Sequence, residues 1–161
     1  MFEYDDYDED AVYHYIFYHL ILGVAYKQAA IDPDWSYALR MELEAFLESK
    51  GCHSLAVAIL PDHVHLVYKG NLNVALDSMV LALKAHLASW IQDHRPTEPA
   101  FAWQEGYGCW TLGPEGLKED RAYLEDQENF HRQVPFLEEY PMLLQAHGIE
   151  YEEEDLFQPL Q

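Results

Sequence analysis

The sequence predicts a single α+β domain with a ferredoxin-like, split β-α-β fold. Residues 11–26, AVYHYIFYHLILGVAY, are rich in β-branched and aromatic side chains, which is typical of a strand. Two further apolar runs, HSLAVAIL (53–60) and HVHLVYK (63–69), are separated only by Pro61-Asp62, a dipeptide that favours a tight turn. The element order β-α-β-β-α-β-α predicts an antiparallel sheet of four to five strands with helices packed on it.

Three helical segments and one more strand complete this order, and a short fourth helix follows. The helices are expected at residues 35–50, 72–93, about 114–132 and 136–148. Gly51 ends the first helix, and Pro114 suits the first turn of the third. The second is the clearest, because its apolar residues form one continuous stripe: Leu76, Met79, Val80, Leu83, Leu87, Trp90 and Ile91. Residues 100–112, AFAWQEGYGCWTL, are expected to form a glycine-broken strand.

The chain of 161 residues is long enough for one domain with a substantial core. Residues 1–12 are predicted to be an acidic disordered tail, and residues 13–157 the single domain. No run reaches the eighteen apolar residues of a membrane span, and the acidic start does not fit a signal peptide. Cys52 and Cys109 belong to no CxxC motif. They predict a cytoplasmic protein without a disulfide framework or structural zinc site.

Charge is the unusual feature of the composition. Nine Lys and Arg stand against 29 Asp and Glu, a formal net charge of -20. Taken alone, this argues against a nucleic-acid partner, because binding to phosphates depends on basic side chains. Six acids lie in the first ten residues and thirteen in 115–157, whereas 51–111 carries five acids and three bases. The simplest interpretation is a solubilising or salt-adapted surface.

Two histidines lie in the middle of the apolar run LPDHVHLVYKG, residues 60–70. Alternate residues of a strand share one face, so His63 and His65 should point the same way, with Val64 and Leu66 on the other face. Histidine is the commonest protein metal ligand, but two ligands alone hold a metal poorly. Since His-x-His also arises by chance, the metal interpretation requires a third ligand.

The helix after Pro114 offers such a ligand and a reactive group. In RAYLEDQENFHRQ, Tyr123 and Gln127 are four residues apart and share a helical face. Tyrosine can act as a covalent nucleophile, and a glutamine carbonyl can bind a hard cation. Asp120 and His131 fall near the same stripe. The pair is also common on ordinary half-buried helices.

Together these motifs resemble those of the single-tyrosine HUH transposases, enzymes of small insertion sequences and REP-associated elements. The resemblance rests on His-x-His after Pro-Asp and on the distal Tyr-x-x-x-Gln. It extends over most of residues 50–157, through LPDHVHLVY, ALKAHLASWI, AWQEGYGCWTL and YLEDQENFHRQVPFLEEYPMLLQAHGIEYEEEDLF.

The resemblance implies a function and a role for each motif residue. His63, His65 and Gln127 would bind Mg²⁺ or Mn²⁺, and Tyr123 would attack single-stranded DNA that carries hairpins. The products would be a 5′-phosphotyrosine and a free 3′-OH, in a homodimer that catalyses DNA transposition. The tyrosine helix could complete the site of its own chain or of the partner.

The sequence departs from the family in its charge. Lys27 is the only base in the stretch where relatives have a basic segment, and the helix of Tyr123 carries five acids against Lys118 and Arg121. DNA affinity should therefore be weak at ordinary ionic strength. Either a high-salt cytoplasm selects an acidic surface, or the protein is a domesticated, non-cleaving module that binds DNA or protein. An unrelated metal-binding protein is a third interpretation, which the long carboxy-terminal similarity opposes.

Five residues are candidates for DNA contacts. Lys84 and Arg95 flank the long apolar helix and could contact phosphates, or be ordinary surface charges. Trp103, Tyr107 and Trp110 could stack on unpaired bases, each stack contributing about 1–3 kcal/mol. Core packing is the simpler interpretation for at least two of these rings.

Overall fold

A computed structural model describes residues 11–161 of the chain. The predicted acidic tail, residues 1–12, lies outside the described residues except for its exposed last two, Ala11 and Val12. The elements are β1 (Phe17–Gly23), α1 (Pro33–Ser49), β2 (His53–Ile59), β3 (His63–Lys69), α2 (Leu76–His94), β4 (Gly108–Leu112), α3 (Pro114–Glu125), α4 (Gln127–His131) and α5 (Phe136–Ala146), with 3-10 turns at Lys27–Ala29 and Glu153–Asp155.

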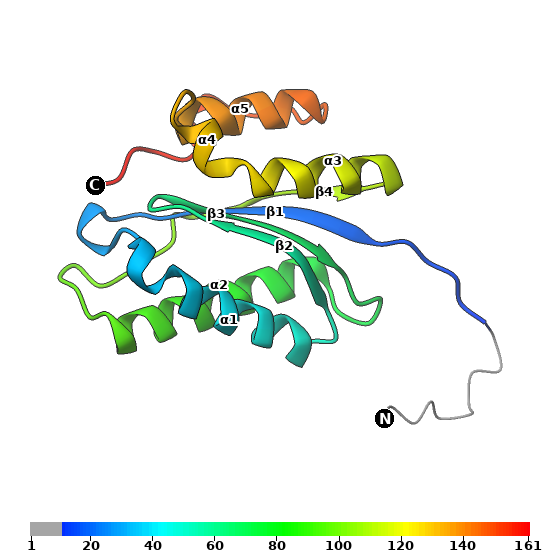
Figure 1. The fold of residues 1–161 in the computed structure, drawn as a ribbon, viewed down its shortest axis with the longest axis horizontal. Helices are drawn as coiled ribbons and strands as arrows, with labels where there is room; N and C mark the ends of the chain where they lie inside the picture. Colours follow the sequence, from blue (N-terminus) through cyan, green and yellow to red (C-terminus); the bar gives the residue numbers. More distant parts are fainter. Residues whose placement is uncertain (1–10) are drawn as a thin grey trace.

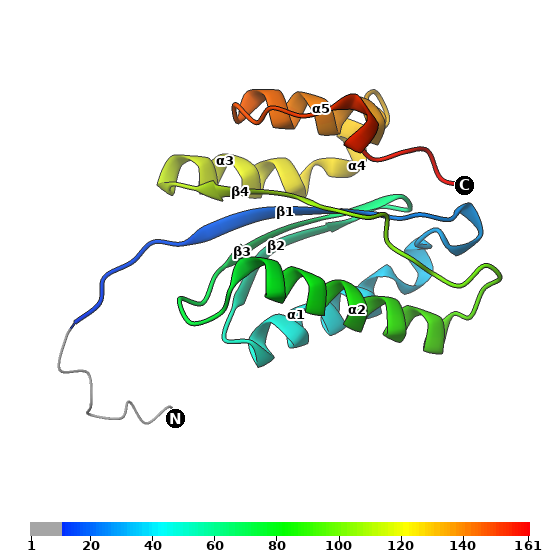
Figure 2. The ribbon, with the colours of Figure 1, turned by 180° about the vertical axis from the view of Figure 1, so that it is seen from behind.

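The sheet has four antiparallel strands in the order β2-β3-β1-β4. Helices α1 and α2 each connect strands that are separated by one intervening strand, and both lie on one face of the sheet (Figure 1). Helices α3, α4 and α5 lie on the opposite face, which the view from behind shows equally (Figure 2). This strand order and layering confirm the predicted α+β, ferredoxin-like fold.

The first and fourth strands, β1 and β4, are both shorter than the sequence pattern suggests. The first begins at Phe17, where the chain gains a partner on each side, Lys69 in β3 and Leu112 in β4. The fourth covers only Gly108–Leu112, because Gly106 adopts a φ of +78° and turns the chain before it. Trp103, inside the expected strand, forms one isolated bridge. Strand length is set here by available partners, which a local pattern does not reveal.

Two helices also differ from the prediction. Helix α2 begins at Leu76, four residues later than expected. The expected helix 114–132 is two helices, because Asp126 leaves the helical region with φ −105° and ψ 15°. Tyr123 therefore lies near the end of α3 and Gln127 at the start of α4. Helix α1 follows the prediction closely: the Asp32 side chain accepts a hydrogen bond from the Asp34 backbone N–H (2.8 Å) at its start.

The central strands divide their residues between two cores. Even-numbered residues of β1 and β3, such as Leu20 and Leu66, pack against α1 and α2. Odd-numbered residues, such as Ile21 and Val67, pack under α3 and α5. The even set includes Val64, Leu66 and Tyr68, so His63 and His65 share the other face, as the alternation predicts. Within residues 11–161, no helix combines the length and apolar character that crossing a bilayer requires.

Replacing Leu83 by alanine should lower the free energy of unfolding by about 2–5 kcal/mol, because the buried side chain leaves a cavity between α2 and the sheet. The matched control is Leu81→Ala in the same helix, where the side chain is 54% exposed and a much smaller change is expected. Urea denaturation of both variants measures the difference. Equal losses would contradict the assigned packing of α2.

Candidate functional site

Four side chains converge beneath helices α4 and α5. They are His63 and His65 of β3, His131 of α4 and Glu139 of α5, and their ligand atoms all lie within 4.8 Å of one another. Glu139 Oε1 is the common point, at 3.1 Å from His65 Nε2, 3.2 Å from His131 Nε2 and 3.4 Å from His63 Nε2. We call this group the His₃Glu cluster.

The fold holds the His₃Glu cluster away from solvent. Glu139 lies on the buried face of α5, beside Phe136 and Tyr140, and is only 1% exposed. The Phe136 ring stacks on the His63 ring with a centroid separation of 3.9 Å. At the edge of the His63 ring, Nδ1 lies 2.7 Å from Asp62 Oδ1. These contacts direct His63 Nε2 toward Glu139.

The donor set fits a divalent cation. His63 Nε2 is buried without a hydrogen-bond partner in the part of the chain that the structure describes. Its 3.4 Å separation from Glu139 Oε1 does not meet hydrogen-bond geometry. An unsatisfied buried nitrogen is costly, and a cation bound among three imidazoles and a carboxylate would satisfy it.

The electrostatics of the His₃Glu cluster keep two residues, His65 and Glu139, in the deprotonated forms that can bind a metal. Burial lowers the pKa of His65 to about 3, and the neighbouring Glu139 only partly opposes this, so the imidazole is neutral. Burial alone would raise the pKa of Glu139, but the three nearby imidazoles of His131, His63 and His65 hold it well below the usual range. For His63, burial alone would lower the pKa, and the nearby carboxylates of Asp62 and Glu139 raise it above its ordinary value.

Tyr123 contacts the His₃Glu cluster directly. Its hydroxyl donates a short hydrogen bond to Glu139 Oε2, the carboxylate oxygen that the histidines do not share. The Tyr123 ring meets His65 edge-on, with centroids 6.0 Å apart. Burial, and then the adjacent Glu139 carboxylate, raise the pKa of Tyr123 above its usual range, so the phenol is protonated. One chain therefore places a tyrosine hydroxyl beside its own histidines.

Gln127 adjoins the His₃Glu cluster through His131. The Gln127 side chain is 2% exposed, and its Oε1 lies 2.9 Å from His131 Nε2. Its Nε2 donates to the Tyr123 carbonyl oxygen (3.4 Å). The break at Asp126 thus keeps Tyr123 and Gln127 together on successive helices. The sequence motifs identified His63, His65, Tyr123 and Gln127 and noted His131, but they did not include Glu139.

Trp110 is the one predicted stacking residue that lies on the face of the His₃Glu cluster. Its ring is 4.6 Å from the His19 ring and 7% exposed, so it packs inside the domain. Trp103 and Tyr107 pack against the core on the α1 and α2 side. Their hydrogen bonds are internal as well, to the Lys84 carbonyl (3.0 Å) and to an aspartate of α2.

The two predicted phosphate-binding residues belong to α2 and its end. Lys84 Nζ donates to the Gln104 and Gly106 carbonyls, each at 2.9 Å, and so fixes the loop before β4. Arg95 follows the last residue of α2. Both lie on the side of the sheet opposite the His₃Glu cluster. DNA binding by these residues stays a prediction.

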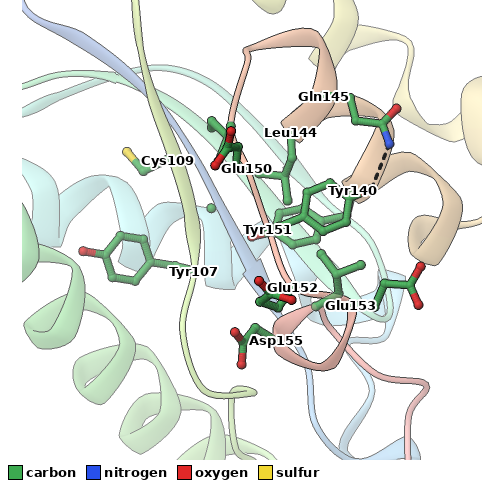
Figure 3. A pocket seen from close by; sticks show the side chains of 13 residues that line it. Tyr107, Cys109, Tyr140, Leu144, Gln145, Glu150, Tyr151, Glu152, Glu153 and Asp155 are labelled. Carbon is green, nitrogen blue, oxygen red and sulfur yellow. Dashed lines mark hydrogen bonds between the residues drawn. The ribbon is translucent and has the colours of Figure 1, made fainter.

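A hollow of about 1050 Å³ lies between β4, α5 and the segment that follows α5 (Figure 3). Its lining includes Glu150, Glu152, Glu153 and Asp155, which disfavour a phosphate backbone. Smaller hollows of about 300 and 350 Å³ reach Gln127 and His131, and the second also contains Arg132. Each of these smaller hollows is lined by Glu128 as well as by one arginine, Arg40 or Arg132.

The chain belongs to the IS200-like transposase family, whose model matches residues 12–127. His131 and Glu139 lie beyond the matched segment. A candidate transposase from Deinococcus radiodurans R1 has a similar structure, with a TM-score of 0.58 and 22% identity over 74% of this chain and 96% of that one. A REP-associated tyrosine transposase bound to a REP hairpin is similar over 94% of each chain, with a TM-score of 0.57 and 12% identity. A comparison with curated protein sequences finds no match.

Proposed function

We propose that this transposase is a metal-dependent enzyme that nicks and rejoins single-stranded, hairpin-bearing DNA through a 5′-phosphotyrosine at Tyr123. One observation carries the proposal: a single buried carboxylate, Glu139, contacts both the Tyr123 hydroxyl and three convergent imidazoles. Family membership supports the transposase chemistry. The hairpin named for the REP-associated neighbour supports the class of substrate.

The His₃Glu cluster would hold the metal. His63, His65 and Glu139 would be three buried ligands. His131 and Gln127 would compete for the remaining protein position, since each contacts the other. The sequence motifs predict Mg²⁺ or Mn²⁺. Three imidazoles favour Mn²⁺ or a related transition-metal ion over Mg²⁺, which prefers oxygen ligands and water.

Tyr123 would act as the nucleophile. Its Oη attacks the phosphorus, the Oη–P bond forms, and the P–O3′ bond breaks, leaving a free 3′-OH after the 3′ oxygen takes a proton from solvent. The hydroxyl proton passes to Glu139 Oε2, which already accepts the hydrogen bond. A bound divalent cation would supply positive charge that stabilises the phosphate oxygens. Reversal on another DNA end rejoins the strands.

A homodimer is part of the proposal. The strand β4 is at one edge of the sheet, with β1 as its partner, and such an edge can pair with a second copy across a two-fold axis. Because Tyr123 contacts the cluster of its own chain, we propose that each protomer carries a site assembled in cis.

Covalent capture tests the proposed reaction. Purified protein is incubated with Mn²⁺ and labelled single-stranded hairpin oligonucleotides, at low and at molar salt, and adducts are separated on a denaturing gel. Tyr123→Phe should reduce the adduct by at least about 10³-fold, because phenylalanine has no nucleophilic oxygen. Tyr37→Phe, at an exposed residue of α1, is the control and should leave it unchanged. An undiminished adduct in Tyr123→Phe would refute the role of Tyr123.

A second candidate function is a non-cleaving binding module on the same fold. The acids that surround Tyr123 on α3 and at its end favour it: Glu119, Asp120, Glu125 and Asp126 outnumber Lys118 and Arg121. The same experiment separates the two functions. Hairpin binding without any adduct, at either salt concentration, would support the module, whereas an adduct formed only at molar salt would support a salt-adapted enzyme.

A further inference from the structure

A row of polar groups, two of them fully buried, leads away from the metal-binding side of His65. His65 Nδ1 lies 2.8 Å from His19 Nε2, and His19 Nδ1 lies 2.8 Å from Asp120 Oδ2. His19 and His65 are both 0% exposed. The three residues come from β3, β1 and α3, so no local motif in the sequence joins them.

The sheet register and one helical turn create this row. His19 is on the face of β1 that carries Ile21, and Ile21 is paired with His65. On β4, Trp110 is paired with His19, and its Nε1 donates to Asp120 Oδ2 (3.3 Å). Asp120 is three residues before Tyr123 on α3, so one helix carries both the end of the row and the proposed nucleophile.

We propose that His19 and Asp120 are positioning residues of the metal centre, which fix the ring and tautomer of His65 so that its Nε2 lone pair points at the metal. The inference rests on the metal centre of the proposed function. An ionised carboxylate only accepts hydrogen bonds, so Asp120 places a proton on His19 Nδ1. With a proton on Nδ1 alone, His19 accepts at Nε2 from His65 Nδ1–H. His65 Nε2 is left with a free lone pair, the form that binds a metal.

The other β3 ligand shows the same arrangement in a simpler form. His63 Nδ1 lies 2.7 Å from Asp62, the adjacent residue, and its Nε2 faces Glu139. Each β3 histidine therefore has a partner at Nδ1 and points Nε2 into the His₃Glu cluster. For His65 the supporting carboxylate is 101 residues from His19 in sequence and belongs to the tyrosine helix. Metal affinity should consequently depend on the correct docking of α3.

The test measures metal binding by the full chain without DNA. His19→Phe keeps an aromatic ring and removes both nitrogens, and Asp120→Ala removes the final acceptor. Both should weaken Mn²⁺ binding by about 10–100-fold in calorimetry, with unchanged stoichiometry. Asp120→Asn should restore most of the affinity, because its side-chain oxygen can still accept from His19. Glu119→Ala, which removes an exposed carboxylate from the same helix, should bind Mn²⁺ as wild type does.

A purely structural role for the row gives a different pattern. It would lower the melting temperature of the metal-free variants and leave the Mn²⁺ affinity of the folded protein unchanged, which would overturn the inference. Visible spectra of Co²⁺-loaded protein provide a second readout. Positioning variants should keep the wild-type band pattern at saturation, whereas His65→Ala, which removes a ligand, should change it.

Failure of this inference can be distinguished from failure of the proposed function. If wild type forms the Tyr123 adduct while His19→Phe and Asp120→Ala bind Mn²⁺ normally, the positioning role is wrong and the transposase chemistry stands. If wild type binds Mn²⁺ and the two variants bind it more weakly, but wild type forms no adduct, the positioning role stands and the nicking reaction fails. Absence of metal binding by wild type overturns the positioning role.

Discussion

Glu139→Gln is expected to weaken Mn²⁺ binding by at least about 100-fold and to remove covalent adduct formation, because one carboxylate has two roles at the site. Its Oε1 faces the three imidazoles, and its Oε2 accepts the Tyr123 hydrogen bond. Glutamine has nearly the same volume, so packing under α5 is retained. It lacks the negative charge that attracts the cation and the basicity that accepts a proton.

Calorimetry with Mn²⁺ measures the first effect of Glu139→Gln, and the hairpin adduct assay measures the second. The control is Glu138→Gln, the preceding residue, whose exposed side chain carries the same charge but does not face the cluster. If Glu139→Gln bound Mn²⁺ and formed adducts as Glu138→Gln does, the carboxylate would have no part in the site. The metal would then have to rely on His63, His65 and Gln127, the set that the sequence motifs suggest.

Simultaneous replacement of His63 and His65 by alanine should abolish detectable Mn²⁺ binding. Each contributes a buried Nε2 directed at Glu139, and the residues left, His131 and Glu139, are too few to hold a divalent ion tightly. Covalent adduct formation should be lost with it.

Calorimetry of the double variant is compared with a double variant of two exposed histidines, His53→Ala with His86→Ala. Their side chains are 63% and 41% exposed and pair with surface glutamates outside the His₃Glu cluster. Far-UV circular dichroism confirms that both proteins fold. Metal binding that survives in the His63 and His65 variant would place the metal elsewhere and invalidate the site.

The sequence predicted the residue pairs whose proximity follows from strand alternation or helical spacing. His63 and His65 share a face because strand residues alternate, and the structure bears this out, since Val64, Leu66 and Tyr68 pack in the core on the other face of β3. Tyr123 and Gln127 were placed together by the four-residue helical spacing. They remain together even though the helix ends at Glu125, because Gln127 still bonds to the Tyr123 carbonyl.

The rest of the site depends on contacts between distant segments. Glu139 is 74 residues from His65 in the chain, and only the packing of α5 on the sheet brings them together. A signal was nevertheless present, since Glu139 falls among Phe136, Tyr140 and Leu144 on the apolar face of α5. An acid at such a position is rarely buried without partners.

His19 could have been noticed in the same way. It is a polar residue among the apolar residues of a central strand, FYHLILG, where burial on both sides of the sheet is expected. Its partners could not be inferred, because they depend on the register between β1, β3 and β4. The break at Asp126 has no glycine or proline to mark it, so helical periodicity alone predicts a continuous helix.

The most direct measurement is to locate the DNA on the protein by mass spectrometry. After reaction with a hairpin oligonucleotide and digestion with nuclease, trypsin cleaves after Arg121 and Arg132. This releases AYLEDQENFHR, in which Tyr123 is the single tyrosine, out of twelve in the chain. We expect the residual nucleotide on this peptide, joined through its 5′ phosphate. A nucleotide attached to any other peptide would contradict the assignment of Tyr123 as the nucleophile.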